Sequence, residues 1–289
     1  MTVELGAFVV PDATEPDAVL EQVLAVERSG LDLVGIQDHP YQRRFFDTFS
    51  LIAFLAARTE RVRLFPAVAN LPLRHPALLA KASASIDVLS GGRFELGLGA
   101  GAFWEAIEAF GGARMTGKES VDALEEAIAI LRACWSGERS VTFEGEHYRM
   151  RGAKFGPPPA HDIGIWLGAY GPRMLRVTGE LADGWVPSLP RVPREEVGAM
   201  RARIDAAAER AGRDPVAIAG IANVNGTITD GGPPTAWLTG PVEHWVQELG
   251  ALASEHRFTG FVLWSEGGPE QLERFAAEVG PGLRAALGA

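Results

Sequence analysis

The 289-residue sequence contains one cysteine, Cys134, and this scarcity excludes two kinds of architecture. A single cysteine cannot form an internal disulfide, and it cannot build a cysteine-rich metal site. The six histidines are scattered with no HxH or HExxH spacing, so the pattern predicts no metal centre. A reducing compartment suits this composition, and we expect the protein in the cytoplasm.

The sequence also lacks an excess of basic residues. Its 27 Lys and Arg stand against 37 Asp and Glu, which gives a formal net charge of −10. Nucleic acids and anionic membranes reward clustered Lys and Arg, so neither is an expected partner. No segment approaches the roughly 20 apolar residues of a membrane span, and no basic leader opens the chain. We expect a protein that binds small molecules.

Short apolar runs alternate with segments of helical period, which is typical of βα units around a parallel sheet. Eight units favour a closed (β/α)8 TIM barrel, a fold of roughly 250 residues. The predicted strands are 4–10, 33–37, 62–68, 93–98, 163–167, 184–187, 218–224 and 260–264. The predicted helices open at Pro16, span 46–58, 76–89 and 121–135, and later begin near Pro172, Pro193, Pro241 and Pro269.

The length beyond a minimal barrel lies between the fourth and fifth units, at about 138–160. Here SVTFEGEHYRMRGAKFGPPP (140–159) predicts a hairpin that turns at Glu144-Gly145, followed by a proline-rich connection. We interpret this segment as an insertion within a single domain, 1–289.

Small residues end the two strand-like runs within 61–101, on either side of a helix that opens at Arg74-His75-Pro76. Glycine and alanine leave the backbone bare, and ligands bind at the carboxyl ends of parallel strands. The spacing of Gly97, Gly99 and Gly101 does not match the dinucleotide fingerprint. Close strand packing and contact with a planar ligand are both open interpretations.

Asp38-His39 directly follows the apolar run LVGIQ, and so lies at the barrel mouth where TIM-barrel catalysts are found. Histidine exchanges a proton near neutral pH, and a neighbouring carboxylate can orient it or raise its pKa. The alternative is an Asp that caps the next helix beside an exposed His. No GxSxG elbow supports a serine hydrolase.

The stretch Gly168-Ala169-Tyr170-Gly171-Pro172 joins a predicted strand to a predicted helix. Free amide hydrogens and the positive end of a helix dipole would meet an anion there, and a phosphate fits. The alternative is an ordinary βα turn with proline at its first helical position. The next residue, Arg173, either assists the anion or is solvated.

Three segments together resemble the bacterial luciferase-like superfamily of flavin- or deazaflavin-dependent oxidoreductases: NLPLRHPALLAKASASIDVLSGGRFELGLGAG, EAFG (108–111) and IWLGAYGPRMLRVTGELADGWVPS (165–188). The resemblance implies a TIM barrel with an insertion and a redox cofactor at the barrel mouth. It also implies a non-proline cis peptide, Ala67-Val68, in a bulge after the third strand, with Ala67, Val68 and Ala69 against the cofactor ring.

Asp38-His39 is similar to the pair of the branch that uses the deazaflavin F420. This resemblance implies hydride transfer between F420 and a small organic substrate, with FMN as the alternative cofactor. His39 would exchange the substrate proton, and Asp38 would orient the imidazole or contact the cofactor. Gly99 and Gly101 would also contact the cofactor, and Gly168, Ala169, Tyr170, Gly171 and Pro172 would receive its phosphate.

One departure concerns Ala102, which stands where sugar-phosphate dehydrogenase relatives carry a glutamate, so an identical reaction is in doubt.

The alternatives are an FMN-dependent monooxygenase of a two-component system and a cofactor-binding protein with little catalysis. A homodimer is implied by the resemblance alone. Phe45, Phe46, Phe103, Trp104 and Trp237 suggest a planar or apolar substrate unless they pack in the core, and the segments 103–113 and 225–240 are the expected pocket walls.

Overall fold

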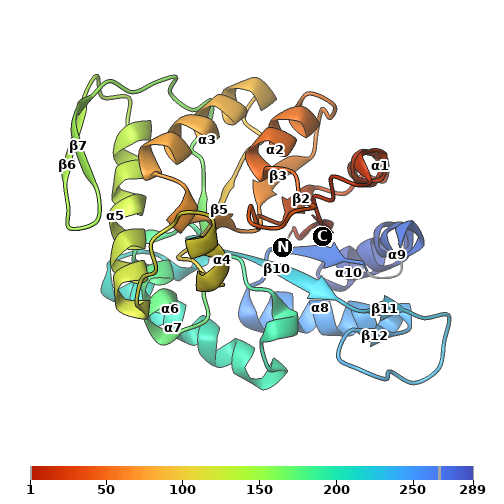
Figure 1. The fold of residues 1–289 in the computed structure, drawn as a ribbon. Coiled ribbons are helices and arrows are strands. Elements are labelled where there is room, and N and C mark those ends of the chain that lie inside the picture. Colours follow the sequence, from red (N-terminus) through yellow and green to blue (C-terminus); the bar gives the residue numbers. More distant parts are fainter. Residues whose placement is uncertain (1, 266–267, 289) are drawn as a thin grey trace.

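Nine parallel strands form one sheet at the centre of the computed structural model, which describes residues 2–265 and 268–288 (Figure 1). The strands are β1 (Glu4–Val9), β2 (Leu33–Ile36), β3 (Arg63–Pro66), β4 (Ala69–Asn70), β5 (Leu96–Gly99), β8 (Ile165–Leu167), β9 (Gly184–Trp185), β10 (Ala219–Asn225) and β13 (Gly260–Trp264). Their order is β3-β2-β1-β13-β10-β9-β8-β5-β4. The predicted TIM barrel is confirmed.

The barrel closes because β3 and β4 are two parts of one wall. Strand β3 pairs with β2, while β4 pairs with β5. A parallel bridge between Leu64 and Phe94 completes the ring next to β5. The third strand was predicted as one run, 62–68, but it breaks after Pro66, where the backbone bulges at Ala67 and Val68 before resuming as β4.

Helices surround the strands in Figure 1. They are α1 (Pro16–Arg28), α2 (Thr48–Ala56), α3 (Pro76–Ser90), α4 (Trp104–Ala109), α5 (Gly117–Trp135), α6 (Pro172–Leu181), α7 (Val197–Arg210), α8 (Val242–His256), α9 (Pro269–Arg274) and α10 (Gly280–Ala286). Single turns occur at Leu71–Leu73, Leu189–Arg191, Arg194–Glu196 and Pro215–Ala217, and a π-turn spans Phe275–Val279. Helix α5 begins four residues before the predicted start, because Thr116 and Glu119 form a capping box.

An antiparallel hairpin, β6 (Val141–Glu144) and β7 (Arg149–Ala153), follows α5 and projects from the edge of the molecule (Figure 1). The Glu126 carboxylate of α5 accepts hydrogen bonds from the backbone N–H groups of Glu146, His147 and Tyr148, and so anchors the turn. The hairpin itself was predicted, while its status as an insertion stays a prediction. A second small pair joins β11 (Thr227–Ile228) to β12 (Thr239–Gly240).

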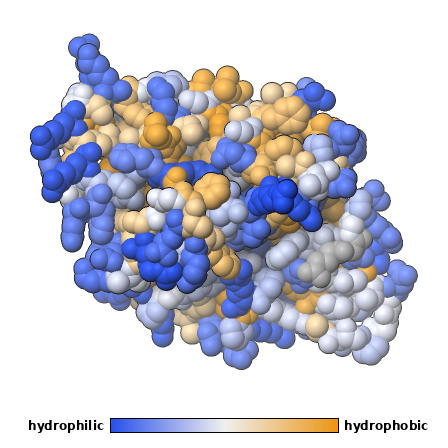
Figure 2. All heavy atoms as spheres, viewed as in Figure 1, coloured by the Kyte–Doolittle hydropathy of each residue, from blue (hydrophilic) through white to orange (hydrophobic). Residues whose placement is uncertain are grey.

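The core lies between the barrel and its helices and contains large aromatic side chains. Trp185 and Trp245 are fully buried, as are Phe94, Phe258 and Phe275. Figure 2 shows a largely hydrophilic outer face that is interrupted by hydrophobic residues toward its upper part, where α2 and α3 lie in the same view. Within 2–265 and 268–288, no helix is long and apolar enough to cross a membrane.

Candidate active site

A cavity of about 240 Å³ opens at the carboxyl ends of the barrel strands. This edge is where parallel α/β barrels place their ligands. All eight walls of the barrel contribute to its lining. The lining residues are Phe8, Gln37, Asp38, His39, Tyr41, Ala67, Val68, Ala69, Asn70, Gly99, Ala100, Gly101, Ala102, Phe103, Gly168, Tyr170, Val186, Ser188, Arg191, Asn223 and Trp264.

Most of the residues predicted for the site meet in this cavity, although their roles stay predictions. Those that line it are Asp38, His39, Ala67, Val68, Ala69, Gly99, Gly101, Gly168 and Tyr170. Three others lie beside it. Ala169 is fully buried, and its carbonyl accepts a hydrogen bond from Trp185 Nε1 at 2.9 Å. Gly171 and Pro172 are exposed at the start of α6.

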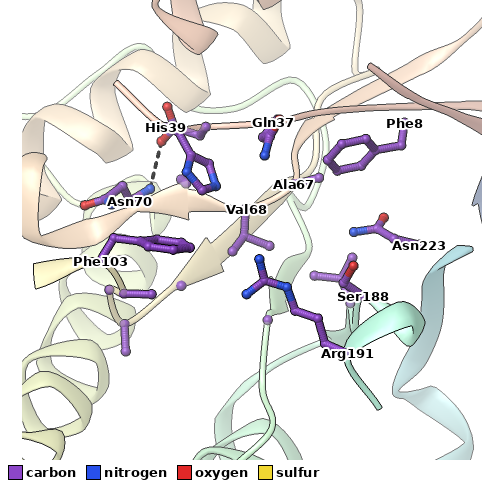
Figure 3. Close-up of a pocket in the computed structure, with 18 of the residues that line it drawn as sticks. Phe8, Gln37, His39, Ala67, Val68, Asn70, Phe103, Ser188, Arg191 and Asn223 are labelled. Atoms are coloured by element: carbon purple, nitrogen blue, oxygen red, sulfur yellow. Dashed lines mark hydrogen bonds between the residues drawn. The ribbon is translucent and has the colours of Figure 1, made fainter. Parts of the chain in front are cut away.

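The bulge after β3 carries the cis peptide bond Ala67-Val68, which confirms the expectation from the resemblance. Two glycines flank the Val68 side chain. A Cβ atom would lie 2.8 Å from Val68 Cγ2 if built on Gly99, and 3.0 Å from it if built on Gly168. Bare backbone on both sides therefore lets Val68 stand in the centre of the cavity floor (Figure 3).

Gly97 and Gly101 belong to the same stretch, but glycine is required at each for a different physical reason. A Cβ on Gly97 would lie 2.0 Å from the Pro66 carbonyl oxygen, so this position requires glycine for strand packing. Gly101 has φ of +106°, a conformation that L side chains rarely adopt. The two interpretations of the motif thus divide by residue: Gly97 serves packing, whereas Gly99 and Gly101 line the cavity.

Asp38 is a buried anchor whose bonds differ from the prediction. Its carboxylate accepts from Arg74 Nη1 at 2.6 Å, from Arg74 Nη2 at 2.9 Å and from the Asn70 backbone N–H at 2.7 Å. The carboxylate accepts no hydrogen bond from the His39 ring in this structure, and the expectation that Asp38 orients the imidazole or contacts the cofactor stays a prediction. The pair instead fixes the end of β4 against the loop after β2.

The hydrogen-bond partner of His39 is a residue that sequence reasoning missed. The Tyr41 hydroxyl lies 3.1 Å from His39 Nδ1. The two rings meet edge-on with centroids 5.4 Å apart, and Phe103 lies 5.3 Å from the imidazole. Among the described residues, Nε2 has no hydrogen-bond partner, and the imidazole points into the cavity above Val68 (Figure 3).

The electrostatic setting of His39 also differs from the expectation. Burial lowers the pKa of His39 below its usual 6.5, the Asp38 carboxylate opposes that shift, and the positive charge of Arg191 adds to it. The neighbouring carboxylate was expected to raise the pKa, but desolvation outweighs it. Burial therefore favours the neutral form of the His39 imidazole.

The loop after β8 presents an open helix end beside the cavity. Gly171 is the N-cap of α6 and supplies no side-chain cap to its amide groups. The exposed surface there has room, because a Cβ on Gly171 would meet nothing within 4 Å. Arg173 neither assists an anion nor is simply solvated: its guanidinium pairs with Asp122 and with Glu125.

Several lining residues were absent from the prediction. Arg191 ends a single turn after β9, where no periodic pattern marks it. Asn223 interrupts the apolar strand β10, and an amide in such a run was a readable signal. Asn223 is 5% exposed, and its Oδ1 has no partner among the described residues. Phe8 and Trp264 pack with ring centroids 5.3 Å apart at the same end of the cavity.

The expected pocket walls are only half right. Phe103 lines the cavity, but Phe45, Phe46, Trp104 and Trp237 do not, and the segment 225–240 contributes no lining residue. Trp237 instead donates to Glu248 at 2.9 Å. Near Ala102, both Glu105 and Glu108 pair with Arg114. In the described part of the chain, no group of three or more His, Cys, Asp or Glu could hold a metal ion.

Comparison with known proteins places this geometry in a family. The luciferase-like monooxygenase model matches residues 3–230. The F420-dependent glucose-6-phosphate dehydrogenase of Nakamurella multipartita is 32% identical over 204 residues, which cover 68% of this chain and 60% of the relative. The 5,10-methylenetetrahydromethanopterin reductase of Archaeoglobus fulgidus is 35% identical over 210 residues, which cover 73% and 60%.

The chain thus spans about 60% of the length of these curated relatives. A solved F420-dependent secondary alcohol dehydrogenase with an F420-acetone adduct has a TM-score of 0.86 to this structure, at 16% identity over 98% of this chain and 100% of that one. At that identity the match shows the shared barrel. Because the family model covers most of the 289 residues, the chain belongs to the luciferase-like monooxygenase family.

Proposed function

We propose that this protein is an oxidoreductase that transfers hydride between F420 and a small organic substrate. The observation that carries the proposal is the His39 imidazole facing a backbone bulge at Val68 in a cavity at the barrel mouth. The names of the N. multipartita dehydrogenase and of the structurally similar alcohol dehydrogenase both specify F420, and they support this choice of cofactor.

The cavity fits the ring portion of a deazaflavin. Its floor is bare at Gly99 and Gly168, so a flat ring can approach the backbone beside Val68. Asn70 Oδ1 is buried and has no partner in the described residues, which leaves an acceptor for a ring N–H. A volume of about 240 Å³ is below the roughly 300–1,000 Å³ of typical ligand sites, so a cofactor tail extends outside.

The tail reaches the loop after β8 in this proposal. Tyr170 lines the cavity, and its hydroxyl accepts a hydrogen bond from the Ser188 N–H at 2.9 Å, which fixes the loop beside the mouth. The uncapped end of α6 at Gly171 offers amide hydrogens to a phosphate. Gly168, Ala169, Tyr170, Gly171 and Pro172 would form this phosphate site.

Bound F420 supplies a carbon that accepts or gives hydride. The contribution of the protein is the proton. In the direction of alcohol oxidation, neutral His39 accepts the hydroxyl proton at Nε2 while its Nδ1–H donates to Tyr41. In the reverse direction His39 returns that proton. Nδ1 carries its hydrogen before and after this transfer, so the Tyr41 hydroxyl oxygen accepts from Nδ1 in both directions.

A two-component FMN monooxygenase is the second candidate, since the family model is described as a luciferase-like monooxygenase. Oxygen consumption with reduced FMN would distinguish it. A cofactor-binding protein with little catalysis would bind F420 tightly and show no turnover across a panel of alcohols and carbonyls. The homodimer expected from the resemblance is part of the proposal, and light scattering of the purified protein tests it.

The deciding test is binding of oxidised F420 and of FMN to the purified protein, with riboflavin as the ring without phosphate. We expect preference for F420, and a His39→Ala variant that binds F420 with unchanged affinity but has lost turnover. Equal turnover in His39→Ala would remove the proposed acid-base role. Preference for FMN would favour the second candidate.

A further inference from the structure

Arg191 is a cation in the cavity that has no carboxylate partner within residues 2–265 and 268–288. It ends the single turn Leu189–Arg191 after β9, and Figure 3 shows its guanidinium extending to the centre of the cavity, below Val68. No ion pair joins its guanidinium to a carboxylate of the described residues, and the guanidinium lies over the Phe103 ring with Cζ 5.9 Å from the ring centroid.

The charge balance of the cavity makes this cation stand out. Five lining residues are titratable: Asp38, His39, Tyr41, Tyr170 and Arg191. The Asp38 charge is matched by Arg74, and burial favours the neutral forms of the imidazole and both phenols. Among the described lining residues, Arg191 is therefore the one charged group without an opposite charge beside it, in a protein whose formal charge is −10. Such a site selects anions locally.

A polar group accompanies the cation. Asn223 is more than nine-tenths buried, its Oδ1 is unpartnered in the described chain, and Figure 3 shows its amide directed into the cavity. Ser188 lies between Asn223 and Arg191: it bridges to Asn223 in the sheet, and its carbonyl accepts the Arg191 N–H at 3.0 Å. The backbone thus holds the guanidinium and the amide on one side of the cavity.

We propose that Arg191 and Asn223 recognise the substrate, and that the substrate is a small hydroxylated organic anion, a carboxylate or a phosphate ester. The guanidinium binds the anionic oxygens, and the amide binds a hydroxyl as donor or acceptor. This inference rests on the proposed function for its assignment to a substrate. The proposed function assigns the cofactor phosphate to the loop after β8. An anion at Arg191 would therefore come from the substrate.

The test measures the affinity of F420-loaded protein for inorganic phosphate and for glycolate by calorimetry. The variants are Arg191→Gln, Arg191→Lys and Asn223→Ala, with Arg203→Gln as the control that removes the same charge from the exposed side of α7. We expect saturable binding in the unchanged protein and in the control. Arg191→Gln should weaken it about tenfold or more, and Arg191→Lys less, because lysine keeps the charge but loses the planar fork.

Asn223→Ala should weaken glycolate more than phosphate, since glycolate adds a carbon-bound hydroxyl. If Arg191→Gln and the control bind the anions with equal affinity, the proposed anion site is overturned. Absence of saturable anion binding in the unchanged protein overturns it as well. Weakened F420 binding in Arg191→Gln, with the anion affinity intact, assigns the cation to the cofactor and overturns the substrate assignment. If F420 does not bind at all, the proposed function fails, while the same anion titration on the cofactor-free protein still tests Arg191.

Discussion

The hydroxyl of Tyr41 lies 3.1 Å from Nδ1 of His39, which makes tyrosine the partner of this imidazole. The adjacent Asp38 is committed to Arg74 and to the backbone of Asn70. A carboxylate partner would favour the imidazolium and raise the pKa of His39. A neutral phenol adds no such charge, so burial sets the direction of the pKa shift. Burial thus favours the neutral imidazole although an acidic residue is adjacent in the chain.

Tyr41→Phe removes that hydrogen bond and keeps the ring. We expect turnover to fall by about tenfold, the worth of one hydrogen bond, with little change in unfolding free energy. The pH profile of kcat/KM measured beside thermal unfolding separates the two effects. An unchanged profile and rate would show that the hydroxyl does not position His39.

His39→Gln should reduce turnover by roughly a hundredfold or more, the usual contribution of general acid-base catalysis. F420 affinity should be preserved, because the lining backbone at Val68 and Gly99 is untouched. Fluorescence titration and steady-state kinetics on one preparation give both values. His161→Gln is the matched control, since that histidine lies outside the cavity and pairs with Asp87.

The pH dependence of proton acceptance follows from the depressed pKa of His39, which burial lowers and Arg191 lowers further. Activity in the oxidation direction should be complete at neutral pH and be lost only as the pH falls below 6.5 through the folded-state pKa. Stability follows the same sign: it is lost on the acid side, because the unfolded chain binds the proton more readily.

Arg191→Gln tests the sign of this effect. Removing a positive charge favours the imidazolium, so the pKa of His39 should rise and the acid limb should move to higher pH. Imidazole NMR resonances measured against pH report the change without any cofactor. A shift to lower pH would contradict the electrostatic picture.

The Asp38–Arg74 pair predicts a stability difference. The side chains of Asp38 and Arg74 are 1% and 14% exposed, so Asp38→Ala should lower the free energy of unfolding by about 3 kcal/mol. Asp47→Ala removes a half-exposed partner of Arg74 together with the N-cap of α2, and should cost about 1 kcal/mol. Urea denaturation measures the loss of unfolding free energy in each variant. Equal losses would mean that burial does not determine how much the Asp38–Arg74 pair stabilises the fold.

Gly171→Asp should change two properties in opposite directions. Aspartate is a better N-cap than glycine, so α6 should gain a few tenths of a kcal/mol. The same carboxylate repels a phosphate, so affinity for F420 or FMN should fall while affinity for riboflavin is retained. Gly171→Ala is the neutral control, since its Cβ meets nothing within 4 Å. Parallel loss of riboflavin binding would point to damage of the cavity.

Much of the fold could be read from the sequence because strand and helix periods are local signals. Glu4–Val9 and Gly260–Trp264 are apolar runs that are buried on both faces, and proline marks the start of α1, α3 and α6. Predicted boundaries were wrong where a capping side chain sets the end of a helix, as Thr116 does at the start of α5.

The site was less accessible to sequence reasoning. Adjacency suggested that Asp38 acts on His39, but a residue 36 positions away, Arg74, captures the carboxylate. Tyr41 was overlooked because a hydroxyl carries no motif, and Arg191 because a single turn has no period. The Asp38–Arg74 pair and the position of Arg191 in the cavity depend on the tertiary structure, whereas Tyr41 lies only two residues from His39.

The most direct measurement of the central claim is anaerobic and aerobic titration of the purified protein with F420 and FMN, oxidised and reduced, followed through the cofactor absorbance. Preferential binding of F420, with hydride exchange to an alcohol or carbonyl and no oxygen uptake, is the expected result. Binding of reduced FMN alone, with oxygen consumed, would contradict a hydride-transfer enzyme and establish monooxygenation.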